Sequence, residues 1–268
     1  MEPFNVYILG CGSALPTPKH MASSQVVEIR GKQFLVDCGE GTQLQIRRSR
    51  INFNKIQAVF ISHIHGDHLF GLFGLLNTMT MYGRTAPLYI YGPQALGSVL
   101  NFYKNFFGEW DCFEIKFVPV SCKEPQVVHT SKHVTVSAFP LQHKIETYGY
   151  RFAAIVTERH WQENPDYHPK SFAYCSDTVP FPEEAAWVRG VDLLYHEATY
   201  PDEMADRAVA HWHSTAGQAA QCARDAGAGR LVIGHYSSRI TDFDALLAQC
   251  QAVFPATEAG QDGSVLEF

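Results

Sequence analysis

Short apolar runs recur along the whole chain and alternate with longer segments of mixed character. The runs are rich in Val, Ile, Phe and Tyr and are bounded by Gly, Pro or Asp, a pattern that predicts β-strands. We expect strands at residues 4–10, 24–31, 32–39, 58–63, 87–92, 113–120, 134–141, 148–154, 172–177, 192–198, 231–236 and 264–268.

The longer segments between the runs predict helices at residues 42–50, 67–83, 93–108, 214–229 and 242–255. Pro93 stands where the first turn of a helix favours proline, and the segment 214–229 opens on Ser-Thr and ends on Gly. Because strands dominate and helices occur in both halves, the pattern predicts two sheets covered by helices, an α/β fold of the layered (α+β) type. The polar stretch 157–171 is expected to be a surface loop.

Length and composition favour a single domain over residues 1–268. With 46% hydrophobic residues, 268 residues suffice for one well-buried core, two small domains being the alternative. The net charge of −6, from 21 Lys and Arg against 27 Asp and Glu, excludes a surface that is basic throughout and leaves a local basic patch open. Arg47, Arg48 and Arg50 form such a patch on a predicted helix, for which a solvated helix face is the simpler interpretation.

The predicted location is the cytoplasm. No apolar stretch is long enough to cross a membrane, and the N-terminus lacks the positive region of a signal peptide. The seven cysteines are scattered without a CxxC pair, so a disulfide framework is not expected and the thiols are interpreted as small buried side chains.

Four residues with metal-binding side chains crowd into "HIHGDH": His63, His65, Asp67 and His68. They follow an apolar run directly, and Gly66 frees the backbone to turn between the first pair and the second. One tight loop thus offers two ligands in one direction and two in another, as a pair of neighbouring metal ions requires. Zinc is bound by imidazole nitrogen and carboxylate oxygen, so the spacing predicts a dinuclear metal site.

The remaining ligands are expected at the ends of other strands. His143, Asp177 and His235 each follow an apolar run, where a site at a sheet edge would be built. Any one of them alone could be a polar residue that ends a strand. Together with the first cluster they predict two complete coordination shells.

Other polar residues allow two interpretations each. The Gly-rich turn "GCGSALPTP", residues 10–18, could offer N–H groups to a phosphate or serve as a tight structural turn. His213 precedes a helix cap and could face a cleft or be a bystander, while Asp37 is expected to support a ligand rather than bind metal. Histidines in polar contexts are expected to be solvated: His20, His129, His133, His160 and His168.

The chain resembles the ribonuclease Z (tRNA 3′-endonuclease) family of the metallo-β-lactamase superfamily. The motifs that carry this resemblance occur in the family's order over nearly the whole chain: "LGCGSALPTPKHMASS", "FLVDCGEGTQLQIRRS", "ISHIHGDHLFGL", "LQHKIETYGYRF", "YCSDT", "LLYHEATY", "HSTAGQAA" and "IGHYSSR". The first histidine cluster alone identifies only the superfamily. "HEATY" followed by "HSTAGQAA" identifies ribonuclease Z.

The resemblance implies an αββα sandwich with two Zn²⁺ ions, or Mn²⁺ or another divalent metal, at one sheet edge. One metal would be held by His63, His65 and His143 and the other by Asp67, His68 and His235, with Asp177 bridging them. Asp67 resembles the family's general base, His213 its general acid, and Glu197 the carboxylate that orients His213. The implied activity is hydrolysis of an RNA phosphodiester by metal-activated water, in the processing of tRNA 3′ trailers.

The segment between His143 and Asp177 departs from the family pattern. Ribonuclease Z enzymes usually carry a long arm there that grips the tRNA elbow, typically across a homodimer, whereas here only residues 144–176 separate the two ligands. The arm is therefore expected to be truncated or absent. The resemblance implies a homodimer with pre-tRNA as partner and no membrane contact; the alternatives are a small-molecule or cyclic-nucleotide phosphodiesterase on the same scaffold and a non-catalytic RNA-binding protein.

Overall fold

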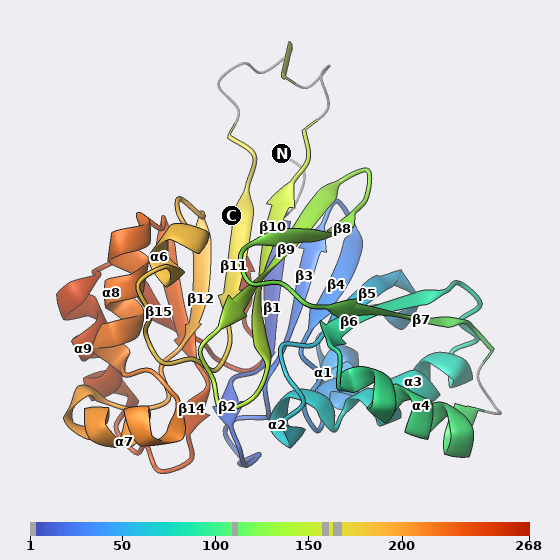
Figure 1. The fold of residues 1–268 in the computed structure, drawn as a ribbon, viewed down its shortest axis with the longest axis horizontal. Coiled ribbons are helices and arrows are strands. Elements are labelled where there is room, and N and C mark those ends of the chain that lie inside the picture. Colours follow the sequence, from blue (N-terminus) through green and yellow to red (C-terminus); the bar gives the residue numbers. More distant parts are fainter. Residues whose placement is uncertain (1–3, 109–111, 157–160, 163–167) are drawn as a thin grey trace.

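Two β-sheets pack face to face, and helices cover the outer face of each (Figure 1). The computed structural model describes residues 4–108, 112–156, 161–162 and 168–268. The first sheet runs in the order β16 (Val265–Glu267), β1 (Phe4–Gly10), β3 (Ser24–Ile29), β4 (Lys32–Val36), β5 (Ile56–Phe60), β6 (Leu88–Pro93) and β7 (Ile115–Val120). The second runs in the order β15 (Thr257–Ala259), β13 (Arg230–Gly234), β12 (Leu193–Glu197), β11 (Ser171–Cys175), β10 (Thr147–Ala154), β9 (Val134–Leu141) and β8 (Gln126–Thr130).

The helices form two groups, one on each outer face (Figure 1). The first sheet is covered by α1 (Thr42–Arg48), α2 (Gly66–Leu69), α3 (Leu72–Met81) and α4 (Leu96–Phe107), with the 3-10 helix η1 (Phe53–Lys55). The second is covered by α6 (Glu184–Trp187), α7 (Ala205–His211), α8 (Ala216–Ala226) and α9 (Phe243–Val253), with η3 (Asp202–Met204). The predicted layered α/β fold with two mixed sheets is confirmed.

Side chains of strand β5 and of Ile61, which follows it, alternate between the two apolar cores of the sandwich. Ala58 and Phe60 point into the core between the two sheets, whereas Val59 and Ile61 point into the core beneath the helices α1 to α4. Alternate residues of a strand face opposite sides, so a strand covered on both faces appears in the sequence as an unbroken apolar run. The Phe60 ring stacks on Tyr91 at 4.7 Å between centroids and contacts aromatic rings of the facing sheet.

Two predicted helices differ from the structure. The segment 67–83 forms α2 and α3 rather than one helix, because the chain at Gly71 approaches the α1 loop so closely that its N–H donates to the Cys38 carbonyl at 2.9 Å. A Cβ at Gly71 would lie 2.0 Å from the Gly39 carbonyl oxygen. Pro93 does not open a helix: it ends β6, paired with Val120, and α4 begins only at Leu96.

The ends of several strands meet at one edge of the sandwich, the lower edge in Figure 1. There the short strands β2 (Gly12–Ser13) and β14 (Tyr236–Ser237) pair in parallel and join an N-terminal loop to the loop after β13. The loop between β5 and α2 lies at the same edge. Segments far apart in the sequence thus converge where the metal ligands were predicted.

The structure bears on the predictions about the cysteines and about membrane-spanning segments. Five of the seven cysteines are buried, as the sequence indicated: Cys11, Cys38, Cys175, Cys222 and Cys250. In the part of the chain that the structure describes, no helix is both long and apolar enough to cross a membrane. The cytoplasmic location stays a prediction.

Candidate metal centre

The loop after β5 presents the first cluster of side chains. The strand ends at Phe60, and α2 begins at Gly66, so His63 and His65 lie on the connection and not on the strand itself. Their side chains nevertheless meet, with His63 Nε2 at 3.0 Å from His65 Nδ1. Asp67 and His68 lie in the first turn of α2 and turn towards the other side of the site.

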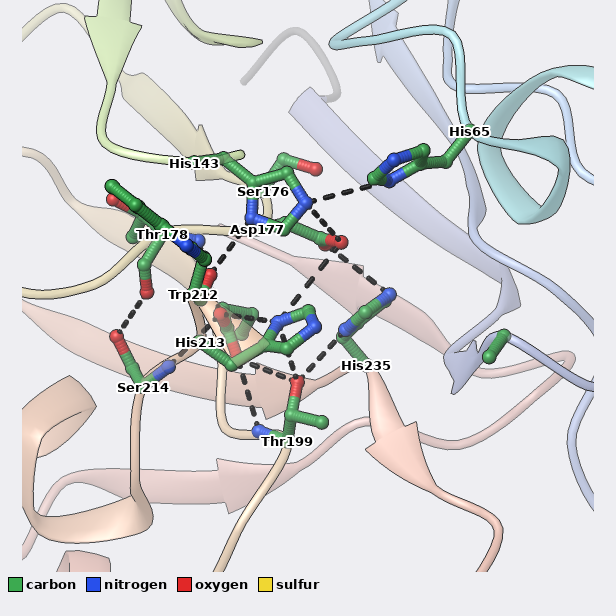
Figure 2. A network of polar contacts seen from close by, with 12 residues as sticks. His65, His143, Ser176, Asp177, Thr178, Thr199, Trp212, His213, Ser214 and His235 are labelled. Atoms are coloured by element: carbon green, nitrogen blue, oxygen red, sulfur yellow. Dashed lines mark hydrogen bonds and ion pairs between the residues drawn. The ribbon is translucent and has the colours of Figure 1, made fainter. Parts of the chain in front are cut away.

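Three further strand ends supply the other predicted ligands. His143 follows β9, Asp177 follows β11 and His235 follows β13 directly. His235 has a left-handed backbone (φ 59°), which residues other than glycine rarely adopt, and this turns its ring into the site. Figure 2 shows His65, His143, Asp177 and His235 converging from different segments.

His63, His65 and His143 form one ligand group. The His143 Nε2 atom lies 3.4 Å from His65 Nδ1 and 3.8 Å from Asp177 Oδ2, and His63 Nε2 lies 3.5 Å from the same carboxylate oxygen. A tetrahedral zinc ion with nitrogen and oxygen ligands at ~2.0–2.2 Å holds them about 3.3–3.6 Å apart. The four side chains therefore have the spacing of one coordination shell.

Asp67, His68 and His235 form a second group. His68 Nε2 lies 3.2 Å from His235 Nε2, and both lie near Asp67 Oδ2, at 3.6 and 3.4 Å. The other oxygen of Asp177, Oδ1, lies 3.4 Å from His68 Nε2 and 3.2 Å from His235 Nε2. Each oxygen of Asp177 thus faces one group, the geometry of a bridging carboxylate. Oδ1 is buried and accepts no hydrogen bond from the residues that the structure describes.

Hydrogen bonds at the far side of the rings fix which nitrogens face the centre. His143 Nδ1 donates to the Trp212 carbonyl at 2.8 Å, and His68 lies with Nδ1 2.7 Å from the Asp37 carboxylate. His235 Nδ1 donates to Thr199 Oγ1, whose own proton goes to a carboxylate. In the neutral form of each ring, Nδ1 therefore carries the proton and the facing Nε2 atom presents a lone pair. Lone pairs that point at one another 3.2 Å apart fit a cation between them.

The charges of the site favour a divalent cation. Burial lowers the pKa of His68, but the carboxylates of Asp177 and Asp67 outweigh burial and raise it well above its ordinary value. Burial raises the pKa of Asp177, but the surrounding imidazoles, His235 first, hold it well below its usual range. Burial lowers the pKa of His63 and His143, which favours their neutral, metal-binding form.

A second polar unit stands beside the metal ligands. His213 Nδ1 lies 2.9 Å from Glu197 Oε1, and Glu197 is fully buried. Burial lowers the pKa of His213, but the carboxylates of Glu197 and Asp177 outweigh it and raise the pKa to about 9. The backbone N–H groups of Thr178 and Ser214 also donate to Glu197 Oε1, each at 3.0 Å. This arrangement keeps Glu197 ionised and His213 protonated at neutral pH.

Thr199 connects this pair to the second ligand group, as Figure 2 shows. Its hydroxyl donates to Glu197 Oε2 at 2.6 Å and accepts from His235 Nδ1 at 2.9 Å. The sequence analysis did not single out Thr199. The spacing in "HEATY" could have revealed it, because Glu197 and Thr199 are two residues apart at the end of a strand and therefore face the same side.

Asp37 lies beneath the centre, with no exposed surface. Its carboxylate accepts hydrogen bonds from Ser62 Oγ at 2.9 Å and Tyr174 OH at 2.7 Å, in addition to its contact with His68. Its backbone is left-handed, with φ 55°. The prediction that Asp37 supports a ligand fits this position, and Ser62 and Tyr174 are partners that the sequence did not reveal.

A cavity of about 710 Å³ opens over the site. It is lined by His65, Asp67, Asp177, His213 and other site residues, and its rim carries the cations Lys144 and Arg239 and the aromatic ring of Phe70. Phe70 is 72% exposed. The Gly-rich turn contributes Ala14, whose N–H donates to Asp67 Oδ2 at 2.7 Å, so this turn orients a site carboxylate.

The histidines that were predicted to be solvated differ in their exposure to solvent. His168 is exposed as predicted, with 67% of its side chain accessible, and His160 lies outside the described residues. For His20 and His129 the prediction is wrong. His129 lies on strand β8 and packs against Phe34, Phe60 and Tyr91 of the facing sheet. His20 is half-buried beside Cys11, because its loop folds back onto the sandwich. His133 is also only partly exposed.

Comparison with known proteins gives consistent results. The beta-lactamase superfamily domain matches residues 32–236. The ribonuclease Z of Bacteroides fragilis is 41% identical over 293 positions, covering 96% of this chain and 96% of that protein, and the ribonuclease Z of Porphyromonas gingivalis W83 is 39% identical, covering 98% of each. Among solved structures, the short form of human tRNase Z superposes with a TM-score of 0.79 at 28% identity, over 98% of both chains.

The alignment with the Bacteroides fragilis protein also reveals a difference in length. It runs over 293 positions, more than the 268 residues of this chain. That relative therefore contains residues that have no counterpart here. The segment between His143 and Asp177, shortened relative to the family pattern, is where such a difference is expected.

Proposed function

Because the chain belongs to the ribonuclease Z family of the metallo-β-lactamase superfamily and is a metal-dependent hydrolase, we propose that it cleaves RNA phosphodiesters at the 3′ trailer of precursor tRNA. The observation that carries this proposal is the contact of His213 Nδ1 with the buried Glu197 at 2.9 Å, at the edge of a two-part ligand set. A phosphodiester releases a poor alkoxide leaving group, and an acid at that position meets this need.

The ligand set fits two Zn²⁺ ions, and its nitrogen and oxygen donors also fit Mn²⁺. His63, His65 and His143 would hold one ion, and Asp67, His68 and His235 the other, with Asp177 shared. Such ions neutralise phosphate oxygens and lower the pKa of bound water. This assignment is supported by the lone pairs that face one another and by the otherwise unsatisfied Asp177 Oδ1.

Side chains of this protein are assigned the proton transfers and the contacts to flanking phosphates. Asp67, held by the Ala14 N–H, is assigned the role of general base towards the attacking water. His213 is assigned the role of general acid, donating from the nitrogen that does not contact Glu197. Lys144 and Arg239 at the cavity rim are positioned to contact flanking phosphates.

A small phosphodiester, including a cyclic nucleotide, is the second candidate substrate. The observation in its favour is the short segment 144–176, which leaves little chain for a tRNA-gripping arm. The third hypothesis, a non-catalytic RNA-binding protein, has no support in the site, because all predicted ligands and the His213–Glu197 pair are present together.

One assay distinguishes these proposals. The protein, supplied with Zn²⁺ or Mn²⁺, is offered a precursor tRNA with a 3′ trailer, a model phosphodiester and a cyclic nucleotide. We expect release of the trailer at the tRNA 3′ end. Cleavage of the small diesters without the precursor tRNA would instead support the second candidate, and failure on all three substrates would leave only the non-catalytic role.

The domain organisation and the oligomeric state are also part of the proposal. We infer one domain over residues 1–268, which is supported by the pairing of β1 with β16, strands from opposite ends of the chain. A homodimer is inferred from family membership. Sedimentation velocity on the purified protein tests it, and a monomer at assay concentration would refute it.

A further inference from the structure

A second cluster of ligand-type side chains lies outside the candidate metal centre, where an N-terminal turn meets the C-terminal turn. Cys11 lies between β1 and β2, His20 lies in the loop after β2, and Asp262 lies between β15 and β16. The Cys11 sulfur is 3.3 Å from His20 Nδ1 and 3.1 Å from Asp262 Oδ1, and the latter two atoms are 3.7 Å apart. Sulfur, nitrogen and oxygen donors from three remote segments thus meet at one point.

We propose that Cys11, His20 and Asp262 bind a thiophilic divalent cation, Zn²⁺ in the first instance, at a site separate from the candidate metal centre. Tetrahedral zinc binds sulfur at ~2.3 Å and nitrogen or oxygen at ~2.0–2.2 Å, which places its ligand atoms about 3.3–3.6 Å apart. Of the three observed separations, 3.3 Å lies at the lower end of this range, 3.1 Å just below it and 3.7 Å just above it.

The Cys11 thiol has more acceptors within reach than it has protons. The Cys11 thiol faces both Asp262 Oδ1 and, at 3.4 Å, the Gly260 carbonyl oxygen, and its single proton serves only one of them. The carboxylate of Asp262 is already fixed by the N–H groups of Cys11 and Met21, at 3.2 and 2.6 Å. A cation in place of the thiol proton satisfies sulfur, imidazole and carboxylate at once.

The surroundings of the cluster allow a cation to replace the thiol proton and a water molecule to serve as the fourth ligand. Burial, with the neighbouring Asp262 carboxylate, raises the pKa of the Cys11 thiol well above its ordinary value, so the cation must displace a proton, which passes to solvent. His20 and Asp262 each line a surface pocket, and both pockets share Thr17, Pro18 and Lys19. A water molecule can therefore complete the coordination shell from the solvent side.

The site would fix the loop that reaches the candidate metal centre. Residues 13–16 line the large cavity, and the Ala14 N–H holds Asp67. A cation bound to Cys11 and His20 closes this loop at both of its ends. Its role is structural: it stabilises the junction between the two chain ends and positions the turn against Asp67.

Cobalt substitution provides a test that needs no substrate. The seven residues assigned to the candidate metal centre supply only nitrogen and oxygen, so a thiolate-to-Co²⁺ charge-transfer band in the near ultraviolet reports a cysteine ligand elsewhere, and its loss in Cys11→Ser assigns it to Cys11. We expect wild-type protein loaded with Co²⁺ to show this band and to bind one equivalent more than Cys11→Ser. Cys122→Ser, a change of the partly exposed thiol between β7 and β8, is the matched control and should keep the band.

A second variant protects the test against misfolding of Cys11→Ser. His20 is half-buried in a loop, so His20→Asn should fold, as circular dichroism will check, and should lose the same equivalent of Zn²⁺ in elemental analysis. A wild-type protein without the band, a band that survives Cys11→Ser, or an unchanged Zn²⁺ content in His20→Asn overturns the proposal. None of these readouts depends on RNA cleavage, so failure here leaves the proposed function untouched.

Discussion

At the level of single residues, the state of His213 depends on the partners of Glu197. Four donors other than His213 reach this buried carboxylate: the N–H groups of Thr178, Thr199 and Ser214 and the hydroxyl of Thr199. They keep it ionised despite its burial, and an ionised Glu197 keeps His213 protonated. His213 and Glu197 therefore form one unit, as the proposed acid and its orienting carboxylate.

Replacing His213 separates acid catalysis from metal binding. We expect His213→Ala to retain both metals, because His213 is outside the proposed ligand set, and to lose about 10²–10⁴-fold in turnover on RNA. On a diester with a nitrophenolate leaving group, which departs without a proton, the loss should be much smaller. An equal loss on both substrates, or a parent rate on RNA, would refute the acid role; His211→Ala, at the cavity rim, is the control.

Removing the charge of Asp37 should weaken metal binding without unfolding the protein. Asp37→Asn keeps the size of the side chain but loses the charge that fixes the His68 Nδ1 proton. Loss of such a supporting group typically weakens metal affinity about 10–100-fold, and competition with a chelator measures this. Asp225→Asn on the exposed side of α8 is the control. Unchanged affinity in Asp37→Asn would show that His68 is oriented by other contacts.

The residue types and their spacing predicted which side chains come together at the candidate centre, because each follows an apolar strand whose end is easily recognised. Their hydrogen-bond partners were not predictable in the same way. Ser62 and Ser176 are common residue types, and the partner of His143 is a backbone carbonyl, which no side-chain motif encodes. The sequence analysis likewise missed the Cys11–His20–Asp262 cluster, whose members are 251 residues apart at most.

At the level of elements, α6 is joined to β12 by a buried pair. His196 Nε2 lies 3.0 Å from Glu184 Oε1, and its Nδ1 donates to the Glu197 carbonyl at 2.7 Å. His196 and Glu197 thus face opposite sides of β12, as their alternation predicts. The pair fixes the strand end that carries Glu197, although neither His196 nor Glu184 lines the cavity.

This pair predicts a pH dependence of stability. Burial lowers the pKa of His196, but Glu184 outweighs it and raises the pKa well above that of the unfolded chain. The pair therefore contributes fully to the free energy of unfolding below the pKa of His196 in the unfolded chain, about 6.5. This contribution is lost as the pH rises through the pKa of His196 in the folded protein. Glu184→Gln should cost roughly 3–5 kcal/mol at pH 6 and less at alkaline pH, as urea unfolding can show.

The neighbouring Glu183→Gln is the matched control for this experiment, because Glu183 lies on the exposed side of the same turn. Its free energy of unfolding should follow the wild-type pH profile. A Glu184→Gln variant whose cost is the same at pH 6 and at alkaline pH would show that His196 is neutral in the folded protein.

Elements that depend on local patterning were predictable, and those that depend on distant contacts were not. The continuous apolar runs of β5 and β13 revealed strands buried on both faces. The sequence pattern did not single out β8, whose residues are mostly exposed at the sheet edge, or β15, which has three residues. The break between α2 and α3 arises from contact of Gly71 with the distant Cys38, which helical periodicity does not encode.

At the level of the whole molecule, the candidate centre is compact while the proposed substrate, a precursor tRNA, is large. The ligands and the His213–Glu197 pair can act on one phosphodiester, whereas recognition of a tRNA requires contacts far from that bond. Residues 144–176 provide little chain for a gripping arm. If precursor tRNA is the substrate as proposed, we expect the acceptor stem, close to the scissile bond, to be the main part that this protein contacts.

This reasoning predicts how cleavage depends on substrate length. A second contact at the tRNA elbow would raise the efficiency on full-length precursor tRNA by about 10²–10⁴-fold over an acceptor-stem minihelix with the same trailer. Without an arm, we expect kcat/KM on the two substrates to agree within about tenfold, or ~1.4 kcal/mol. A minihelix without a trailer is the blank. If full-length precursor is preferred by a hundredfold or more, another surface of the protein must contact the elbow, and the short segment between His143 and Asp177 does not limit recognition.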